Sequence, residues 1–178
     1  ASLAGMKAIV VHPRMDFMLY AMDPIVNQAA KWSHMFGGQA QPSVTFRGII
    51  NRGGEQGAQH SQALHAWFSH VPGLRVVMPS CVADARDLLI AAVLCPDPVV
   101  YIDDRWLYEQ SDNIGCVTEC DLKNEGPKVV VEGTDVTIVG VGFATHLGKL
   151  AAERLLSEGI LAEVIDVRVL NPLNASVI

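Results

Sequence analysis

The sequence predicts an α/β fold in which a mostly parallel sheet is flanked by helices, and three observations lead to this prediction. Short apolar or β-branched runs alternate with longer segments of helical composition. Glycine and proline stand at most of the junctions between these segments. A clean strand–helix–strand pattern then follows near the carboxyl terminus. Strands that alternate with helices in this way form parallel sheets that are covered on both faces.

The first two elements are a strand and a long helix. Lys7–Val11 is a short apolar run that is typical of a buried strand. Asp16–Phe36 has a helical composition and ends at a pair of glycines, which commonly terminate helices. Pro24 is compatible with this helix if a new first turn begins there, with Asp23 as its N-terminal cap.

A strand, a loop, a helix and a second strand are expected next. Ser43–Ile50 alternates in polarity and is rich in β-branched residues, so it is predicted to be a strand. Asn51–Gly57 carries three glycines and is predicted to be a loop. Ser61–His70 is an expected helix that ends before a Pro-Gly pair, and Arg75–Met78 is an expected strand.

The next helix and strand complete the first domain, which we expect to span residues 1–110. Ser80 is a candidate cap for a helix at Val82–Leu94, which a Pro-Asp-Pro sequence ends. Val99–Ile102 is the next expected strand. Asp103–Val129 shows little periodicity, and a connection of this length is unusual inside one domain. We therefore place a linker at 111–128.

The region 129–178 is predicted to begin a second α/β domain. Val136–Val141 and Glu163–Val167 are expected strands on either side of a helix at Thr145–Glu158. A further helix is expected to start after Asn174. Because the chain opens close to a strand and closes in this new helix, we expect it to be a fragment of a longer protein.

Composition excludes several classes of function. The formal net charge is −6, and lysines and arginines are scattered, so neither a nucleic acid nor a membrane surface is an expected partner. No apolar run approaches the roughly 20 residues that span a bilayer. The four cysteines have no CxxC spacing, which favours a reduced intracellular chain over a zinc site.

A series of motifs in order resembles one known family over nearly the whole chain. They resemble the β subunit of thiamine-diphosphate-dependent 2-oxo acid dehydrogenases, the E1 component, within the transketolase superfamily. The main motifs are Asp16-Phe17, Ala21-Met22-Asp23, Asn27-Gln28-Ala29-Ala30-Lys31, Phe46-Arg47-Gly48, Gln59-His60-Ser61-Gln62, Pro72-Gly73-Leu74, Asp97-Pro98-Val99, Glu132-Gly133-Thr134-Asp135-Val136-Thr137, Asp166-Val167-Arg168 and Pro172-Leu173.

The resemblance implies a fold, a reaction and partners. The first domain would be a truncated transketolase-type pyrimidine-binding domain, and the second would be part of a transketolase C-terminal domain. The reaction would be oxidative decarboxylation of pyruvate or a branched-chain 2-oxo acid, with acyl transfer to lipoate. The cofactor would be thiamine diphosphate with Mg²⁺, shared with an E1 α-like subunit. β chains would also associate with one another, and a lipoyl-bearing E2 is a further possible partner.

The resemblance also implies that this sequence holds only part of a catalyst. The glutamate that contacts the cofactor pyrimidine in this family would lie before Ala1. The diphosphate-binding Gly-Asp-Gly…Asn motif does not occur in this sequence. Both would be supplied from outside it. The compartment would be a bacterial cytoplasm or a mitochondrial matrix.

Four site residues follow from the resemblance. Phe17 matches the position that packs on the aminopyrimidine ring, where offset stacking excludes water. Tyr20, one helical turn later, would face the same pocket, although the family often has Gln there. Pro13 likewise replaces a longer side chain. His60 matches the histidine near the reacting carbon, where an imidazole can donate a proton or assist acyl transfer.

Two further sites are less determined. Arg47 would bind a carboxylate or the acidic rim of a lipoyl domain, or would form an ion pair that holds its loop. A structural potassium ion would be held through backbone carbonyls. Its matching positions are Val44, Ala92, Val93, Cys95 and Asp97.

Three alternatives remain open from the sequence. A transketolase-like or deoxyxylulose-phosphate-synthase-like transferase would need cations for a phosphosugar, and only Arg47 and Arg52 stand nearby. A non-catalytic assembly subunit would lack the upstream glutamate. The turn at Gly140–Thr145 with Asp166 imitates an NAD fingerprint, but its third glycine is replaced by Thr145.

Overall fold

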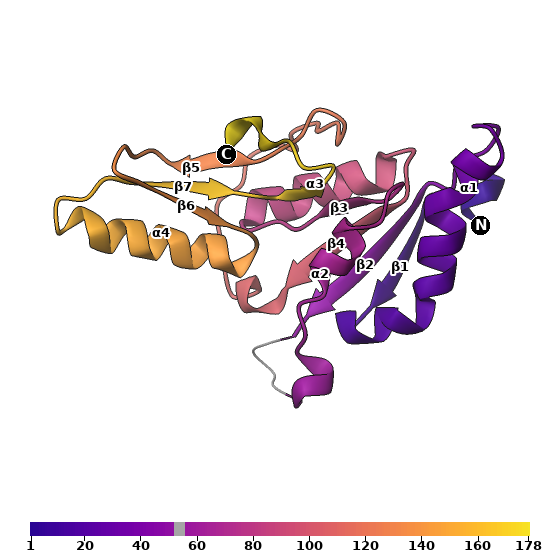
Figure 1. The fold of residues 1–178 in the computed structure, drawn as a ribbon, viewed down its shortest axis with the longest axis horizontal. Coiled ribbons are helices and arrows are strands. Elements are labelled where there is room, and N and C mark those ends of the chain that lie inside the picture. Colours follow the sequence, from indigo (N-terminus) through magenta and orange to yellow (C-terminus); the bar gives the residue numbers. More distant parts are fainter. Residues whose placement is uncertain (52–55) are drawn as a thin grey trace.

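The computed structural model describes residues 1–51 and 56–178, and the chain forms a larger and a smaller α/β unit (Figure 1). The larger sheet contains, in spatial order, β1 (Ala8–His12), β2 (Val44–Ile50), β4 (Val99–Asp104), β3 (Arg75–Val77) and β8 (Val169–Asn171). The first four strands are parallel, and β8 runs antiparallel to β3. The predicted mostly parallel sheet is therefore confirmed.

The long helix expected at Asp16–Phe36 is helical almost throughout, but its helix type changes twice. A 3₁₀ segment, η2 (Met15–Ala21), leads into a π-helical segment, η3 (Asp23–Ala29), and then into α1 (Ala30–Met35). The prediction that Asp23 caps a new helix was wrong. It is the first residue of η3, and its Oδ1 accepts a hydrogen bond from Asn27 Nδ2 at 2.8 Å.

The helix expected at Ser61–His70 is shorter than predicted. A 3₁₀ turn, η4 (Ala58–His60), comes first, and only α2 (His65–Ser69) is α-helical. By contrast, α3 (Val82–Leu94) has the predicted bounds. Ser80 does not cap it, because Cys81 is the N-cap residue and Ser80 Oγ donates to Asp166 instead.

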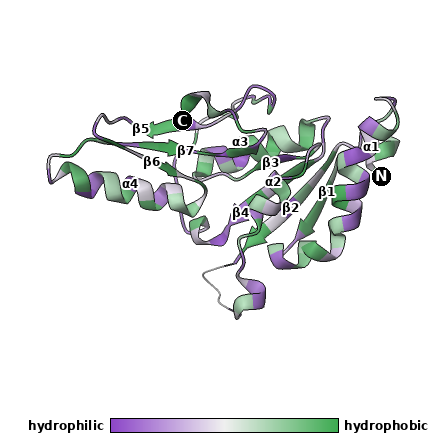
Figure 2. Ribbon diagram, in the orientation of Figure 1, coloured by the Kyte–Doolittle hydropathy of each residue, from purple (hydrophilic) through white to green (hydrophobic). Residues whose placement is uncertain are grey.

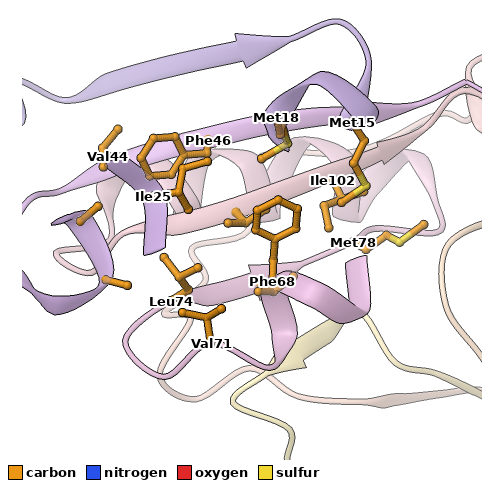
Figure 3. Close-up of a cluster of buried hydrophobic side chains, with 14 of the residues drawn as sticks. Met15, Met18, Ile25, Val44, Phe46, Phe68, Val71, Leu74, Met78 and Ile102 are labelled. Atoms are coloured by element: carbon orange, nitrogen blue, oxygen red, sulfur yellow. The ribbon is translucent and has the colours of Figure 1, made fainter. Parts of the chain in front are cut away.

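Both faces of the larger sheet are covered by apolar side chains. On one face, η2, η3 and α2 contribute Met15, Met18, Ile25 and Phe68, which meet β-strand residues such as Phe46 and Ile102 (Figure 3). On the other face, α3 packs Leu88 and Ala91 against Val99 and Tyr101. Burying each large side chain contributes about 1.5–3 kcal/mol, so these two layers hold the sheet in place.

The smaller unit is the predicted strand–helix–strand pattern. β6 (Val136–Gly140) and β7 (Ala162–Asp166) are parallel and are joined by α4 (Phe143–Leu156). β5 (Lys128–Val131) adds an antiparallel edge to β7. Figure 2 shows mainly hydrophobic strands here and an α4 that alternates hydrophobic and hydrophilic residues.

Three features of the connections differ from the expectation. The region of little periodicity at Asp103–Val129, within which the linker was predicted at 111–128, begins inside β4, forms a short 3₁₀ turn, η5 (Arg105–Leu107), and ends inside β5. The strand β8 was missed altogether, and it returns the chain from the smaller unit to the larger sheet. The helix expected after Asn174 is a 3₁₀ turn, η6 (Ala175–Val177).

Within residues 1–51 and 56–178, no helix has the length and apolar character required to cross a membrane.

Candidate functional site

Phe17 and His60 meet although they lie far apart in the sequence. Phe17 belongs to η2 and His60 is the last residue of η4, and both are half-buried. Their ring centroids are 5.0 Å apart with an interplanar angle of 83°, so the rings meet edge to face. This is a favoured geometry for aromatic pairs. The structure therefore brings together two of the residues that the resemblance assigns to the cofactor site.

A buried carboxylate connects the same two segments. Asp16 is 4% exposed, and its Oδ1 accepts hydrogen bonds from the backbone N–H of Gln62 at 3.1 Å and from Gln62 Nε2 at 2.8 Å. Hydrogen bonds to a charged acceptor are about twice as strong as neutral ones. Asp16 thus fastens the segment after η4 to η2.

Two buried polar atoms at this site have no hydrogen-bond partner among the described residues. They are Asp16 Oδ2 and His60 Nδ1. Buried polar atoms are paired in the great majority of cases, and unpaired ones are commonly found where a ligand or water binds. An aromatic ring beside unpaired donors and acceptors suits a planar heterocycle with polar substituents, such as an aminopyrimidine.

Tyr20 lies at the open side of this site. Tyr20 is 91% exposed, and its ring lies 6.3 Å from that of Phe17 with an interplanar angle of 18°. Pro13 is also exposed. A cavity of about 470 Å³ elsewhere is lined instead by residues that include His34, Arg75 and Asp97. Phe17, Tyr20 and His60 therefore form an aromatic surface that is exposed on the Tyr20 side.

Arg47 forms an ion pair within the sheet. It lies on β2, and its Nε donates to Asp103 Oδ2 on β4 at 2.5 Å. Burial raises the pKa of the Asp103 carboxyl, and the hydrogen bond from Arg47 partly opposes that shift. The ion-pair interpretation of Arg47 is the one that the structure supports. Arg52, the other cation expected here, lies outside the described residues.

One of the carbonyls assigned to potassium, that of Cys95, has a cationic partner. Lys7 Nζ donates to Ser43 Oγ at 2.6 Å, to the Leu94 carbonyl at 3.1 Å and to the Cys95 carbonyl at 3.4 Å. Ser43 Oγ also donates to the Cys95 carbonyl at 2.5 Å. The carboxyl end of a helix attracts cations, and here an ammonium group occupies that position. The potassium site at Val44, Ala92, Val93, Cys95 and Asp97 stays a prediction, and an ammonium group already binds one of these five carbonyls, that of Cys95.

The glycine turn that imitates an NAD fingerprint is filled by protein. A Cβ on Gly140 would lie 2.7 Å from the backbone nitrogen of Thr145, and one on Gly142 would overlap Met78 Cε. Asp166 is fully buried, and it accepts hydrogen bonds from Ser80 Oγ at 2.5 Å and from Thr145 Oγ1 at 2.9 Å. These residues join the two units, and the carboxylate has no free face for a ribose.

Sequence reasoning missed Asp16 and Gln62 as site residues. Both stand in motifs that were recognised, next to Phe17 and close to His60. Their contact, however, spans 46 positions along the chain, and no periodicity or spacing predicts such a pair.

Comparison with protein families gives two matches. Residues 1–110 match the transketolase pyrimidine-binding domain family, and residues 127–178 match the transketolase C-terminal domain family. The two matched regions correspond to the larger and the smaller α/β unit, apart from β8.

Curated relatives match almost the whole chain. The β subunit of the pyruvate dehydrogenase E1 component of Rhizobium meliloti is 37% identical, over 98% of this chain and 38% of the relative. The mitochondrial subunit β-1 of the pyruvate dehydrogenase E1 component of Arabidopsis thaliana is 40% identical, over 100% of this chain and 50% of the relative. The β subunit of acetoin:2,6-dichlorophenolindophenol oxidoreductase of Cupriavidus necator is 40% identical, over 98% of this chain and 51% of the relative. The chain thus spans about half the length of these relatives or less.

Solved structures agree on the fold. A split-gene transketolase, described as an inactive β4 tetramer, superposes with a TM-score of 0.72 at 23% identity, over 94% of this chain and 50% of that one. A transketolase from Pichia stipitis superposes with a TM-score of 0.72 at 18% identity, over 98% of this chain and 25% of that one. At these identities the likeness concerns the fold alone.

Proposed function

This chain belongs to the transketolase pyrimidine-binding domain family, and from that premise we propose that it is a β subunit, or part of one, of a thiamine-diphosphate-dependent 2-oxo acid dehydrogenase. The curated relatives at 37–40% identity support this assignment. The observation that carries it is the Phe17–His60 pair, which stands beside two unpaired buried polar atoms. We also propose the division into 1–110, 111–128 and 129–178, with β8 as a return to the larger sheet.

The residues of this chain fit the pyrimidine side of the cofactor. Thiamine diphosphate, with Mg²⁺ at its diphosphate, would supply the nucleophile for decarboxylation when it is bound. Phe17 would stack on the pyrimidine and exclude water, and Tyr20 would extend that aromatic surface. The His60 imidazole would donate a proton to the oxygen that develops negative charge on the substrate. Pro13 would line the rim of the site.

The open site explains why a partner is proposed. An exposed Tyr20 and a half-buried Phe17 need a second surface to become a dry pocket. An E1 α-like subunit with the diphosphate motif would provide it. Association between β chains and docking of a lipoyl-bearing E2 are further parts of the proposal. By analogy with relatives from bacteria and mitochondria, the compartment would be the cytoplasm or the mitochondrial matrix.

The substrate is proposed as pyruvate or a branched-chain 2-oxo acid. Acetoin oxidation is a second candidate, because the relative from Cupriavidus necator is as similar to this chain as the plant pyruvate dehydrogenase subunit is. A sugar-phosphate transferase is less favoured. Arg47 is paired with Asp103, so it is not free to bind a phosphate.

Reconstitution tests the proposed function. The complete reading frame would be expressed with an α-like chain, and consumption of pyruvate, branched-chain 2-oxo acids and acetoin would be followed with an artificial electron acceptor. We expect turnover that requires thiamine diphosphate and Mg²⁺. His60→Ala should lower turnover by about 10²–10⁴-fold without changing the melting temperature or the cofactor affinity.

His70→Ala is the matched control, since this exposed histidine lies at the end of α2, in a different element from Phe17 and His60. It should leave turnover unchanged. A folded complex that binds no thiamine diphosphate would contradict the proposal and favour an assembly subunit. A His60→Ala chain that does not fold would instead assign His60 a structural role.

A further inference from the structure

The loop that carries His60 is attached at both sides of the imidazole. On the amino-terminal side, the His60 backbone N–H and Ser61 Oγ both donate to the Gly57 carbonyl, each at 3.1 Å. Gly57 has a φ of 84°, which glycine adopts without strain. On the carboxyl-terminal side, Gln62 donates twice to Asp16. The first attachment is local, whereas the second reaches η2.

Asp16 and Phe17 act on this loop from neighbouring positions of η2. Asp16 receives the two hydrogen bonds of Gln62, and Phe17 receives the edge contact of His60. Two donors from one residue to one carboxylate oxygen restrict both the position and the rotation of the loop. The imidazole is thus placed against the ring by a contact two residues away from it.

The chemical character of Asp16 argues against a purely packing role. A carboxylate is among the groups least often buried, because removing its charge from water is unfavourable. Its hydrogen-bond donors among the described residues all come from Gln62, and its second oxygen has none there. An apolar residue would fill this place at lower cost if filling were the whole requirement.

We propose that Asp16 is a positioning residue whose buried carboxylate, acting through Gln62, holds His60 edge-on to Phe17. The inference rests on the proposed function for the catalytic consequence, because the imidazole must reach a substrate beside the Phe17 ring. A displacement of about 1 Å at such a group can cost about 10²-fold in rate. The placement of the imidazole itself can be measured without any cofactor.

Nuclear magnetic resonance of the chain with labelled histidine and phenylalanine tests the placement. The Phe17 ring should change the chemical shifts of the His60 ring protons and give nuclear Overhauser contacts with them. His60→Gln identifies the His60 signals, because they disappear in that variant. Phe17→Leu gives the chemical shift of His60 without the neighbouring ring. Asp16→Leu has a similar size but no acceptor, so it should move the His60 shift to that baseline. Asp16→Asn retains an acceptor oxygen and should restore most of the contact.

Asp23→Leu is the matched control. Asp23 is an acidic residue of the next helical segment, and its carboxylate binds Asn27 within that segment. This variant should leave the His60 shift unchanged. If Asp16→Leu keeps the wild-type shift and contacts, the inference is overturned. If Asp16→Leu does not fold, Gln62→Met decides, because it lacks the side-chain donors; it should weaken the contact, and an unchanged contact would overturn the inference.

The catalytic consequence is read separately in the reconstituted assembly. With thiamine diphosphate at saturation, Asp16→Leu should lower kcat by about 10–100-fold and change the KM of the 2-oxo acid by less than about threefold, since it displaces the reacting imidazole. An unchanged kcat would overturn the catalytic role. If the wild-type assembly shows no turnover, the proposed function fails, while the magnetic resonance result still decides whether Asp16 holds His60.

Discussion

Two regions of the molecule each contain a buried aspartate. One is the contact between the two α/β units at Asp166, Ser80 and Thr145, called the joint here, and the other is the Phe17–His60 site. The two carboxylates differ in how many of their oxygens accept hydrogen bonds. At the joint, both oxygens of Asp166 accept hydrogen bonds, from Ser80 and Thr145. At the site, Asp16 uses one oxygen for Gln62, and its other oxygen has no partner among the described residues. A fully paired carboxylate stabilises a fold, whereas a partly paired one leaves capacity for a ligand.

The two regions also differ in packing, because side chains fill the joint tightly and leave one side of the Phe17–His60 site exposed. Met78 from the larger unit fills the space beside Gly142, and Gly140 closes tightly on Thr145. Tyr20, beside the site, is 91% exposed. The glycine turn that imitates an NAD fingerprint is therefore filled by protein, whereas the region of the Phe17 and His60 motifs has an exposed side.

The largest effect on stability should come from the joint. Asp166→Ala removes the acceptor of two buried hydroxyls, and we expect the free energy of unfolding to fall by about 3 kcal/mol in urea titrations. Asp135→Ala is the control, because that exposed carboxylate accepts from the Leu161 N–H at 2.7 Å. It should cost about 1 kcal/mol or less. Equal losses would break the comparison.

Glycine substitutions should give the next largest effect. Gly140→Ala places a methyl group 2.7 Å from the Thr145 backbone nitrogen, so the strand and helix must move apart. We expect a loss of about 2 kcal/mol by thermal denaturation. Gly159→Ala isolates the cost of a positive φ, since it has φ of 79° and open space around it, and it should cost about 1 kcal/mol. A smaller loss at Gly140 would indicate a loosely packed turn.

A smaller effect is expected from pH, because the contribution of Asp166 to the free energy of unfolding should fall as the pH rises. Burial raises the pKa of its carboxyl above the ordinary value of 3.8, so the folded chain binds this proton more tightly than the unfolded chain does. The contribution of the protonated Asp166 carboxyl to the free energy of unfolding is fully present below pH 3.8. It is lost as the pH rises through the raised pKa of the folded state. The stability of wild type relative to Asp166→Asn should therefore decrease as the pH rises. A difference that is flat or increases would contradict this.

The smallest effect on stability is expected at the open side of the site. Tyr20→Ala removes an exposed ring, so the free energy of unfolding should change by less than about 0.5 kcal/mol. In the reconstituted assembly, the same variant should weaken cofactor binding. A large loss of stability would show that Tyr20 belongs to the fold rather than to a binding surface.

Elements with local signals were predicted well. The helix α3 has the predicted bounds because a Pro-Asp-Pro sequence ends it and its apolar positions recur at helical spacing. The strand β8 was missed because its three residues form a strand only by pairing with β3, which lies far away along the chain. The segment 61–64 was predicted as helix, but Gln62 there binds Asp16 instead.

The sequence by itself determined the α/β class, the order of most elements and the motifs that contain Phe17 and His60. These depend on composition, on glycine and proline, and on periodicity within short segments. Only the tertiary structure decided that Asp16 holds the His60 loop, that Lys7 lies at the end of α3 and that Asp166 joins the units. Those contacts link residues 46, 88 and 86 positions apart, respectively. Packing of whole elements brings such residues together, and no local pattern encodes it.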